Sequence, residues 1–437
     1  MQSFAKLLLL FGLLALASAS PVGIQKRGVY KVERVPNPNY TGRNGPRALL
    51  KTLRKYRMPI PASVAGAAQQ QSEMISKREP KRGKGRGQRQ KGQNGGAATT
   101  GQAAAAGSAA NGTGLVTNTP EANDVEYLSP VTIGGQTLNL DFDSGSSDLW
   151  VFNSQLSTAA TQGHTIYDPT KSTTFALMQG ATFEISYGDG SGAAGNVGTD
   201  TVDIGGATVT NQAVEMATAV SRSFVEDTNN NGLLGLAFST LNTVQPAQQK
   251  TFFDNVKDSL AEPVFTADLR AQAAGAYEFG RVDTSKFTGA MTWVPVNTTD
   301  GFWQFTSEKF AVDGGTTQTS TAGAQAIADT GTTLLLADPA VAQAYYAQVD
   351  GAVDDEQQGG FTFPCDATLP DLQIDVGGTM ATVKGTDINF AQVDDQTCFG
   401  GLQATTAGLQ IYGDIFFKSN FVAFNGGNNT LGFAQHA

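Results

Sequence analysis

Residues 138–152 read LNLDFDSGSSDLWVF, in which an apolar run ends in Asp143-Ser144-Gly145-Ser146 before apolar residues resume. The chain repeats this arrangement 186 residues later, where Ala326-Ile327-Ala328 precede Asp329-Thr330-Gly331-Thr332. An acid at the end of a buried strand is costly unless donors surround it. The neighbouring hydroxyls and the N–H groups of a glycine turn supply such donors. Two such loops at half-chain spacing predict a duplicated lobe, in which Asp143 and Asp329 meet at a pseudo-two-fold axis.

The two loops resemble the active-site loops of pepsin-type aspartic endopeptidases. The surrounding sequences, FDSGSSDLWVF and ADTGTTLLL, are most similar to those of secreted fungal, endothiapepsin-like members, and the resemblance extends over about 126–433. It implies an all-β, bilobal pepsin-like fold with two pseudo-symmetric β lobes that flank a substrate cleft. Short β-type runs between glycine-rich turns agree with that fold. We expect an N-terminal lobe over 114–298, a C-terminal lobe over 299–437, and helices mainly over 246–260 and 338–349.

The resemblance also implies the chemistry of the two acids. Asp143 and Asp329 would form a catalytic dyad that shares a proton and activates a water molecule against a peptide bond. Two carboxyls this close cannot both ionise easily, as pepsin exemplifies, so one pKa falls while the other rises. The neighbouring hydroxyls would support the dyad, the first pair by locking the loops together and the second by binding the outer carboxylate oxygens: Ser144 and Thr330, then Ser146 and Thr332.

The sequence FEISYGDGSG is typical of a hairpin and resembles the flap that closes over the substrate in this family. Tyr187 matches the flap tyrosine, and Trp150 matches its hydrogen-bond partner. Phe224 and Leu233 match positions that line the pocket before the scissile bond; core packing is the alternative interpretation of both. Asp189, at the flap tip, either forms the turn or meets a basic side chain in that pocket. The expected substrates are proteins and peptides, cut between large apolar residues.

Charge is distributed unevenly along the chain. Residues 1–113 carry 19 Lys and Arg against 3 Asp and Glu, whereas residues 114–437 carry 10 against 36. A basic arm can bind nucleic acid, but we expect its partner to be the acidic body of the same chain, and no nucleic acid. The prediction is a prosegment over 20–113 that inhibits the enzyme intramolecularly. Its basic low-complexity part, from about Gln69, is too poor in apolar residues to order itself. By resemblance Lys55-Tyr56 would reach the catalytic acids; an ordinary amphipathic helix is the alternative.

Residues 1–19 combine a basic start, the apolar run LLLLFGLLALASA and a small-residue cleavage site, which is typical of a secretory signal peptide. The run is shorter than the roughly 20 residues that a membrane helix needs. We therefore expect a secreted, extracellular monomer with no membrane partner. Cys365 and Cys398 would pair in an oxidising compartment, and the family has a disulfide at the matching place; two free thiols are the alternative. We expect no cofactor and no metal, because His164 and His436 lie far apart in the sequence.

Three other functions compete with this one. A glycosidase also uses paired acids, but it has no need for two Asp-hydroxyl-Gly-hydroxyl loops or a flap. A serine hydrolase is disfavoured because the chain has no G-x-S-x-G motif and only 2 histidines. A pepsin-like protein that binds without cleaving should have lost a dyad acid or the flap tyrosine, and this chain keeps Asp143, Asp329 and Tyr187.

Overall fold

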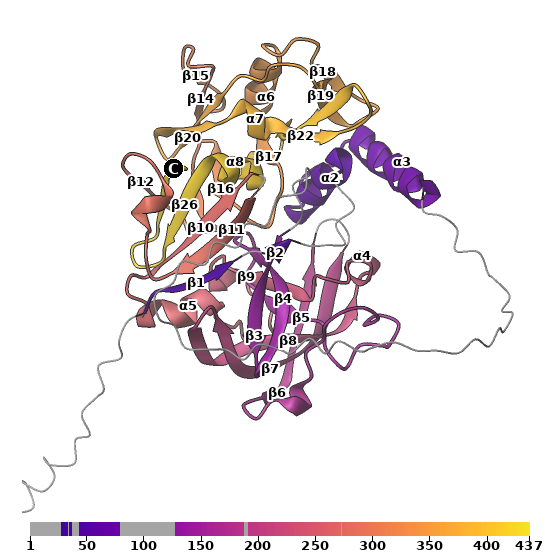
Figure 1. Cartoon of the computed structure of the whole chain (residues 1–437), viewed down its shortest axis with the longest axis vertical. Coiled ribbons are helices and arrows are strands. Elements are labelled where there is room, and N and C mark those ends of the chain that lie inside the picture. The colour runs from indigo at the N-terminus through magenta and orange to yellow at the C-terminus, as the bar shows by residue number, and fades with distance from the viewer. Residues whose placement is uncertain (1–27, 34, 37–42, 79–126, 188–190, 272) are drawn as a thin grey trace, which may run out of the picture.

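The computed structural model describes residues 28–33, 35–36, 43–78, 127–187, 191–271 and 273–437. Its strands form two β lobes, one above the other in Figure 1, which are joined by a sheet that both lobes share. The predicted all-β, bilobal fold is confirmed, because strands provide most of the regular structure. None of the helices described is long and apolar enough to cross a bilayer.

The N-terminal lobe is built on an eight-stranded sheet. Its strands lie side by side in the order β2 (Val35–Pro36), β3 (Tyr127–Ile133), β4 (Gln136–Asp143), β9 (Gly232–Gly235), β5 (Leu149–Val151), β8 (Ala207–Val220), β7 (Gly192–Ile204) and β6 (Ala176–Ser186). β7 and β8 form a long hairpin around Gly205 and Gly206, whose φ values of 60° and 101° favour glycine. Buried residues alternate with less buried ones along the second half of β7, as expected for a strand that packs one face on a core.

Three smaller sheets form the C-terminal lobe. The first has the order β13 (Gln304–Thr306), β16 (Gln325–Ala328), β25 (Leu409–Tyr412), β17 (Leu335–Ala337) and β24 (Leu402–Ala404). The second has the order β15 (Gln318–Thr319), β14 (Lys309–Val312), β20 (Leu372–Val376) and β21 (Thr379–Val383). The third, which we call the outer sheet, has the order β18 (Val353–Asp355), β19 (Gly360–Pro364), β23 (Thr397–Gly400) and β22 (Asn389–Gln392).

The shared sheet joins the two lobes. It has the order β1 (Tyr30–Glu33), β11 (Ala273–Phe279), β10 (Val264–Arg270), β26 (Asn420–Asn425), β27 (Thr430–Gln435) and β12 (Thr292–Pro295). Where β10 meets β26, the rings of Phe265 and Phe424 stack with centroids 4.4 Å apart. Trp303 packs against both rings and donates a hydrogen bond from Nε1 to Leu236 O (2.9 Å). The aromatic core of the shared sheet therefore extends to the segment that follows β9.

The two lobes repeat one strand arrangement at their centres. In the N-terminal lobe, β9 pairs in parallel with β4 and antiparallel with β5. In the C-terminal lobe, β25 pairs in parallel with β16 and antiparallel with β17. Each catalytic-loop candidate therefore connects two strands that share a central partner, as the predicted duplication requires.

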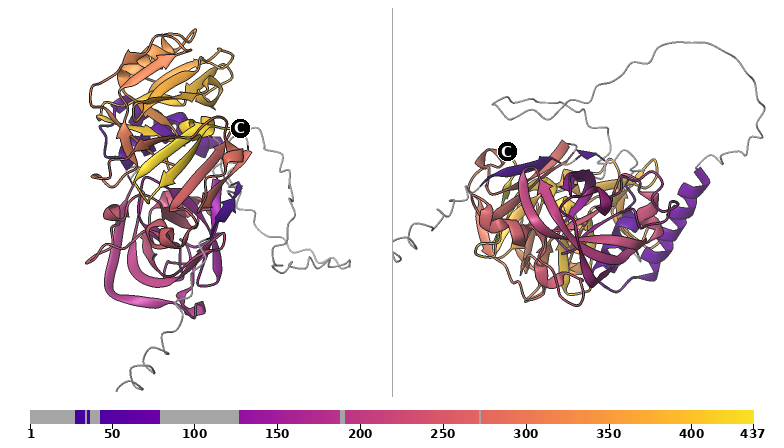
Figure 2. Two further views of the ribbon diagram at one scale, coloured as in Figure 1. Left: turned by 90° about the vertical axis from the view of Figure 1, so that its left-hand side faces the viewer. Right: turned by 90° about the horizontal axis from the view of Figure 1, so that it is seen from below.

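Short helices cover the sheets. Two longer helices lie in the described residues before 79, a segment that we call the leader. The short ones are α4 (Arg222–Glu226), α5 (Phe252–Val256), α6 (Pro339–Tyr346), α7 (Gly385–Ile388) and α8 (Asp414–Ser419). The leader adds β1 at the edge of the shared sheet, α2 (Gly45–Lys55) between the lobes, and α3 (Ala62–Arg78) along the outside of the C-terminal lobe. Figure 2 shows α3 at the surface of the molecule from a second direction.

Two local predictions differ from the structure. The helix expected over 246–260 is confined to α5 and a 3₁₀ turn, because the Asn242 side chain accepts from Gln249 N (2.7 Å) and closes this segment as a loop. The segment expected to lack order from Gln69 onward begins with helix, since α3 continues to Arg78. Packing of its earlier residues on the C-terminal lobe provides the burial that the sequence from Gln69 lacks.

Candidate active site

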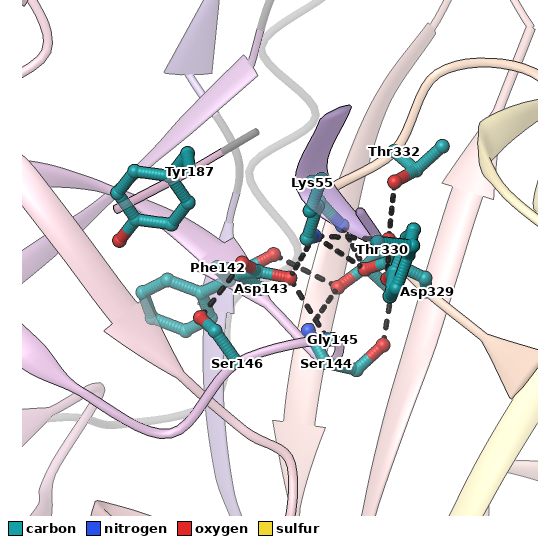
Figure 3. A network of polar contacts seen from close by, with 12 residues as sticks. Lys55, Phe142, Asp143, Ser144, Gly145, Ser146, Tyr187, Asp329, Thr330 and Thr332 are labelled. Carbon is teal, nitrogen blue, oxygen red and sulfur yellow. Dashed lines mark hydrogen bonds and ion pairs between the residues drawn. The ribbon is translucent and has the colours of Figure 1, made fainter. Parts of the chain in front are cut away.

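The two Asp-hydroxyl-Gly-hydroxyl loops face each other between the lobes (Figure 3). The Asp143 carboxyl is buried, its Oδ1 accepts from Gly145 N (2.8 Å), and its Oδ2 accepts from Ser146 Oγ (2.7 Å). The loop therefore supplies both of the donors that an acid at a strand end needs.

Asp329 has the equivalent surroundings in the other loop. Its Oδ1 accepts from Gly331 N (3.0 Å), and its Oδ2 accepts from Thr332 Oγ1. The carboxyl is also fully buried. The outer hydroxyl pair, Ser146 and Thr332, thus contacts the two acids in matching positions.

The glycines of both loops are required by the close approach of the opposite acid. A Cβ atom on Gly145 would lie 2.6 Å from Asp329 Oδ1, and one on Gly331 would lie 2.3 Å from Asp143 Oδ1. Neither position has room for a side chain. This geometry explains why each Asp-hydroxyl pair is followed by glycine.

The inner hydroxyl pair, Ser144 and Thr330, links the two loops. Ser144 Oγ donates to Ala328 O (2.9 Å) and accepts from Thr330 N (2.9 Å). Thr330 Oγ1 donates to Phe142 O (2.8 Å) and accepts from Ser144 N (3.1 Å). The four contacts form a reciprocal set across the pseudo-two-fold axis and fix the two lobes in register at the acids.

The leader places a lysine directly between the acids. Lys55 Nζ lies 2.7 Å from Asp143 Oδ1, and 3.1 and 2.9 Å from Asp329 Oδ1 and Oδ2. Tyr56 OH donates to Asp329 Oδ2 (2.5 Å). The expected Lys-Tyr pair therefore contacts both acids, and its ammonium group occupies the space between them.

The end of α2 directs this pair into the site. Met58 N donates to Leu53 O (2.7 Å) and Arg57 N donates to Arg54 O (2.8 Å), which is the Schellman pattern at a helix C-terminus. Arg57 takes the left-handed conformation that the pattern requires, with φ 53°. The N-terminus of α2 is capped by Asn44, whose side chain accepts from Arg47 N (2.9 Å).

Burial and the lysine act in opposite directions on the two acids. Burial raises the pKa of Asp143 to about 6, against the opposing charge of Lys55 and with the support of the Asp329 charge. Burial also acts upward on Asp329, but Lys55 and the hydrogen bonds from Thr332 and Tyr56 outweigh it and lower that pKa to about 2. Lys55 itself keeps its proton, because attraction to both acids outweighs its desolvation and raises its pKa. At pH values between these two pKa values, the pair of acids carries a single negative charge.

The predicted flap and pocket residues form one apolar cluster next to the acids. Trp150 Nε1 donates to Tyr187 OH (2.8 Å). The Phe224 ring packs edge-on against Trp150 and Tyr187, with centroids 4.8 and 5.8 Å away. Leu233 belongs to the same cluster. Asp189 lies outside the described residues.

Sequence reasoning missed how the leader contacts the outer sheet. Arg43 Nη1 donates to Phe390 O (2.6 Å) and its guanidinium lies over the Phe390 ring. Further along the leader, the backbone of Gly45 lies close to the Phe399 ring, and that of Val64 lies close to Gly359. Gln71 Nε2 donates a hydrogen bond to Gln358 Oε1 (3.0 Å). In the sequence, these contacts were indicated only by the helical spacing of three apolar residues in α3, namely Val64, Ala67 and Ala68.

The outer sheet also contains the disulfide. Cys365 and Cys398 are bonded, with an S–S distance of 2.06 Å, so the predicted pairing is confirmed. Cys398 lies on β23 and Cys365 directly follows β19, the strand beside it. The bond therefore joins neighbouring strands of the surface on which the leader packs.

The fold and the paired loops define a bilobal aspartic protease, and comparison with known proteins agrees. The family model described as eukaryotic aspartyl protease matches residues 126–436. The chain belongs to this family and is an aspartic endopeptidase, a hydrolase of the fungal pepsin type.

Several curated relatives resemble it over most of their length. It is 47% identical over 415 residues to endothiapepsin from Cryphonectria parasitica, which covers 93% of this chain and 90% of that protein. It is 45% identical over 421 residues to aspergillopepsin-1 from Aspergillus oryzae, with 96% of both chains covered. It is 50% identical over 326 residues to penicillopepsin-1 from Penicillium janthinellum, which covers 74% of this chain and 99% of that protein.

Proposed function

We propose that Asp143 and Asp329 are the catalytic dyad of a secreted acid endopeptidase that is made as a zymogen. The observation that carries this proposal is the pair of buried carboxyls facing each other from two equivalent loops. An acid that is ionised can remove a proton from a water molecule, while its protonated partner donates to the carbonyl or the leaving amine. Two carboxyls this close hold one shared proton more easily than they both ionise, which suits that division of roles.

The loops support this chemistry by fixing the acids before substrate arrives. The outer hydroxyls hold one oxygen of each carboxyl, and the inner pair prevents the lobes from shifting at the axis. Such preorganisation is the main contribution that a protein makes to positioned acid–base chemistry. No step requires a cofactor.

Substrate preference follows from the apolar cluster. Tyr187, Phe224 and Leu233 belong to one apolar cluster, so we propose cleavage of proteins and peptides between large apolar residues. Asp189 remains a candidate for accepting a basic residue just before the cut.

The leader is proposed to be an intramolecular inhibitor. Lys55 Nζ occupies the space between the acids, which is where an attacking water molecule would have to bind. Its positive charge also neutralises the carboxylate that catalysis needs. We propose a division into a signal peptide over 1–19, a prosegment over 20–113, an N-terminal lobe over 114–298 and a C-terminal lobe over 299–437. The signal-like start and the disulfide support secretion, and a monomer that binds neither nucleic acid nor membrane fits the same assignment.

The test is hydrolysis of acid-denatured haemoglobin, with pepstatin as the inhibitor control. We expect the activated protein to cleave it in acid, and Asp143→Asn or Asp329→Asn to abolish cleavage while each variant still folds. The double variant should lose no more than either single one, because the two acids act as one unit. Turnover by either single variant would show that the dyad is wrongly assigned. A folded wild-type protein without activity would favour a pepsin-like binding protein instead.

A further inference from the structure

A second pair of acids lies behind the loop that carries Asp143, and the proposed catalysis does not use it. Asp148, in the segment between that loop and β5, and Glu215 on β8 are each 1% exposed. β5 runs parallel to β8 with Trp150 opposite Glu215, so the sheet topology brings the two carboxyls together. Asn242 Nδ2 lies 3.2 Å from Asp148 Oδ1 and 3.0 Å from Glu215 Oε1. One side-chain amide therefore bridges two buried acids.

The second oxygen of each acid has no donor. Asp148 Oδ1 accepts from Thr243 N and Thr243 Oγ1, both at 2.9 Å. Asp148 Oδ2 and Glu215 Oε2, in contrast, are buried with no hydrogen-bond partner in the described structure. Ionised carboxylates only accept hydrogen bonds, so two facing carboxylates cannot satisfy each other. A single proton on either acid turns one of them into a donor.

We propose that Asp148 and Glu215 share one proton and, in that form, position the loop that carries Asp143. The pair is connected to this loop through backbone contacts. Asn242 Nδ2 also donates to Ser147 O (3.2 Å), and Gly235 N donates to Asp148 O (2.9 Å). In the next residue of the same segment, Leu236 N donates to Asp143 O (2.7 Å). The two acids are positioning residues, because their contacts are with the loop and its supports.

The surroundings of the pair contain no compensating cation in the described structure. Burial raises the pKa of Glu215 well above its ordinary value of 4.5, and the Asp148 charge raises it further. Burial likewise raises the pKa of Asp148, against hydrogen bonds from Thr243. The other titratable group that faces both acids is the Tyr187 phenol, whose pKa is raised by burial and then by the charges of Asp143, Asp148 and Glu215.

The sign of the pH effect follows from this shift. Glu215 keeps its proton in the folded protein at pH values where the unfolded chain releases it. Unfolding above about pH 4.5 therefore releases a proton, and stability falls as pH rises until the folded pair also deprotonates. The pair stabilises the loop in acid, and its second ionisation weakens the N-terminal lobe towards neutral pH.

The sharpest variant is Glu215→Gln, which is close to isosteric and provides a permanent donor to Asp148. We would measure thermal unfolding of the full chain between pH 4.5 and 7.5 in an Asp329→Asn background, which prevents self-cleavage. We expect Glu215→Gln to gain stability relative to its parent as pH rises. The matched control is Glu262→Gln, just before β10, an exposed acid whose loss should give no such gain. This unfolding measurement needs no turnover, so it tests the pair even if the dyad assignment fails.

A second measurement separates positioning from bulk stability. In the otherwise wild-type enzyme, the neutral limb of the kcat/KM profile should move upward by about half a pH unit or more in Glu215→Gln and should not move in Glu262→Gln. Should Glu215→Gln fail to fold, Asp148→Asn carries the same expectation. A stability difference that does not change with pH, or a neutral limb that stays in place, overturns the proposal.

Discussion

At the scale of single residues, the site depends on two small hydroxyls. Ser144 and Thr330 each pair with a carbonyl and an N–H of the opposite loop, so two side chains satisfy four backbone groups. Both residues are buried. Because a buried polar group without a partner is costly, the loss of either hydroxyl affects both lobes at once.

Replacement of Ser144 by alanine tests this contact. The change leaves Thr330 N without its acceptor and Ala328 O without its donor, so we expect a loss of about 1–3 kcal/mol in the free energy of unfolding. We also expect kcat to fall more than KM rises, because the change misaligns the two acids but leaves the substrate pocket intact. Denaturant unfolding and steady-state kinetics measure the two effects. Ser154→Ala is the exposed control, and an equal effect of both variants would contradict the interpretation.

At the scale of elements, the leader contains a second helix that holds it to the outer sheet. α3 buries Val64, Ala67 and Ala68 against the C-terminal lobe. A Cβ on Gly359 would lie 2.6 Å from Val64 Cα, which shows how closely the helix approaches. These contacts are apolar or uncharged, so they do not weaken in acid as the Lys55 contacts do.

The variant Ala68→Glu should loosen this helix. It places a larger, polar side chain in a buried position next to the C-terminal lobe, which is costly without a partner. We expect the precursor to process itself faster at pH 4–5 than the wild type, as measured by gel densitometry over time. Ala62→Glu adds the same side chain at an exposed position of the same helix and should behave as wild type. Equal rates for both variants would mean that α3 does not restrain the leader.

These elements also show which features of the fold and the site can be predicted from the sequence alone. The paired loops were predictable because acid, hydroxyl and glycine act locally, and each motif lies within four residues. α3 was missed because its apolar stripe consists of one valine and small alanines and runs into a glutamine-rich segment. The Asp148–Glu215 pair was missed because the acids are far apart in sequence and meet only through the pairing of β5 with β8. Strand pairing of this kind is set by the tertiary fold rather than by local propensity.

At the scale of the whole molecule, a basic leader covers the cleft of an acidic body. Lys55 lowers the pKa of both Asp143 and Asp329. The acids therefore bind protons more tightly once the lysine leaves, so its departure takes up protons and is favoured as pH falls. The opposite net charges of the leader and the body add an attraction that salt screens beyond about 8–10 Å.

Precursor carrying Asp143→Asn separates release from cleavage. At about pH 3–4 it should free α2 from the cleft yet stay uncut, because the dyad is incomplete. Hydrogen exchange of the amides in 45–55 would report the release, and a gel would report the chain length. Wild-type precursor under the same conditions should release and cut its leader. Self-cleavage by the pure variant, or a wild type that stays intact, would show that another protease performs activation, for example at Lys77-Arg78.

The position of β1 has a consequence for the enzyme after its leader is gone. β1 pairs with β11 from Tyr30–Phe279 to Glu33–Ala276 and thereby closes one margin of the shared sheet. Loss of the leader uncovers a row of backbone donors and acceptors, which is a template for pairing with another chain. In the proposed zymogen, the leader would therefore protect solubility as well as restrain activity. If the leader is removed on activation, as we propose, the same step would make the molecule able to self-associate, unless another segment takes the place of β1.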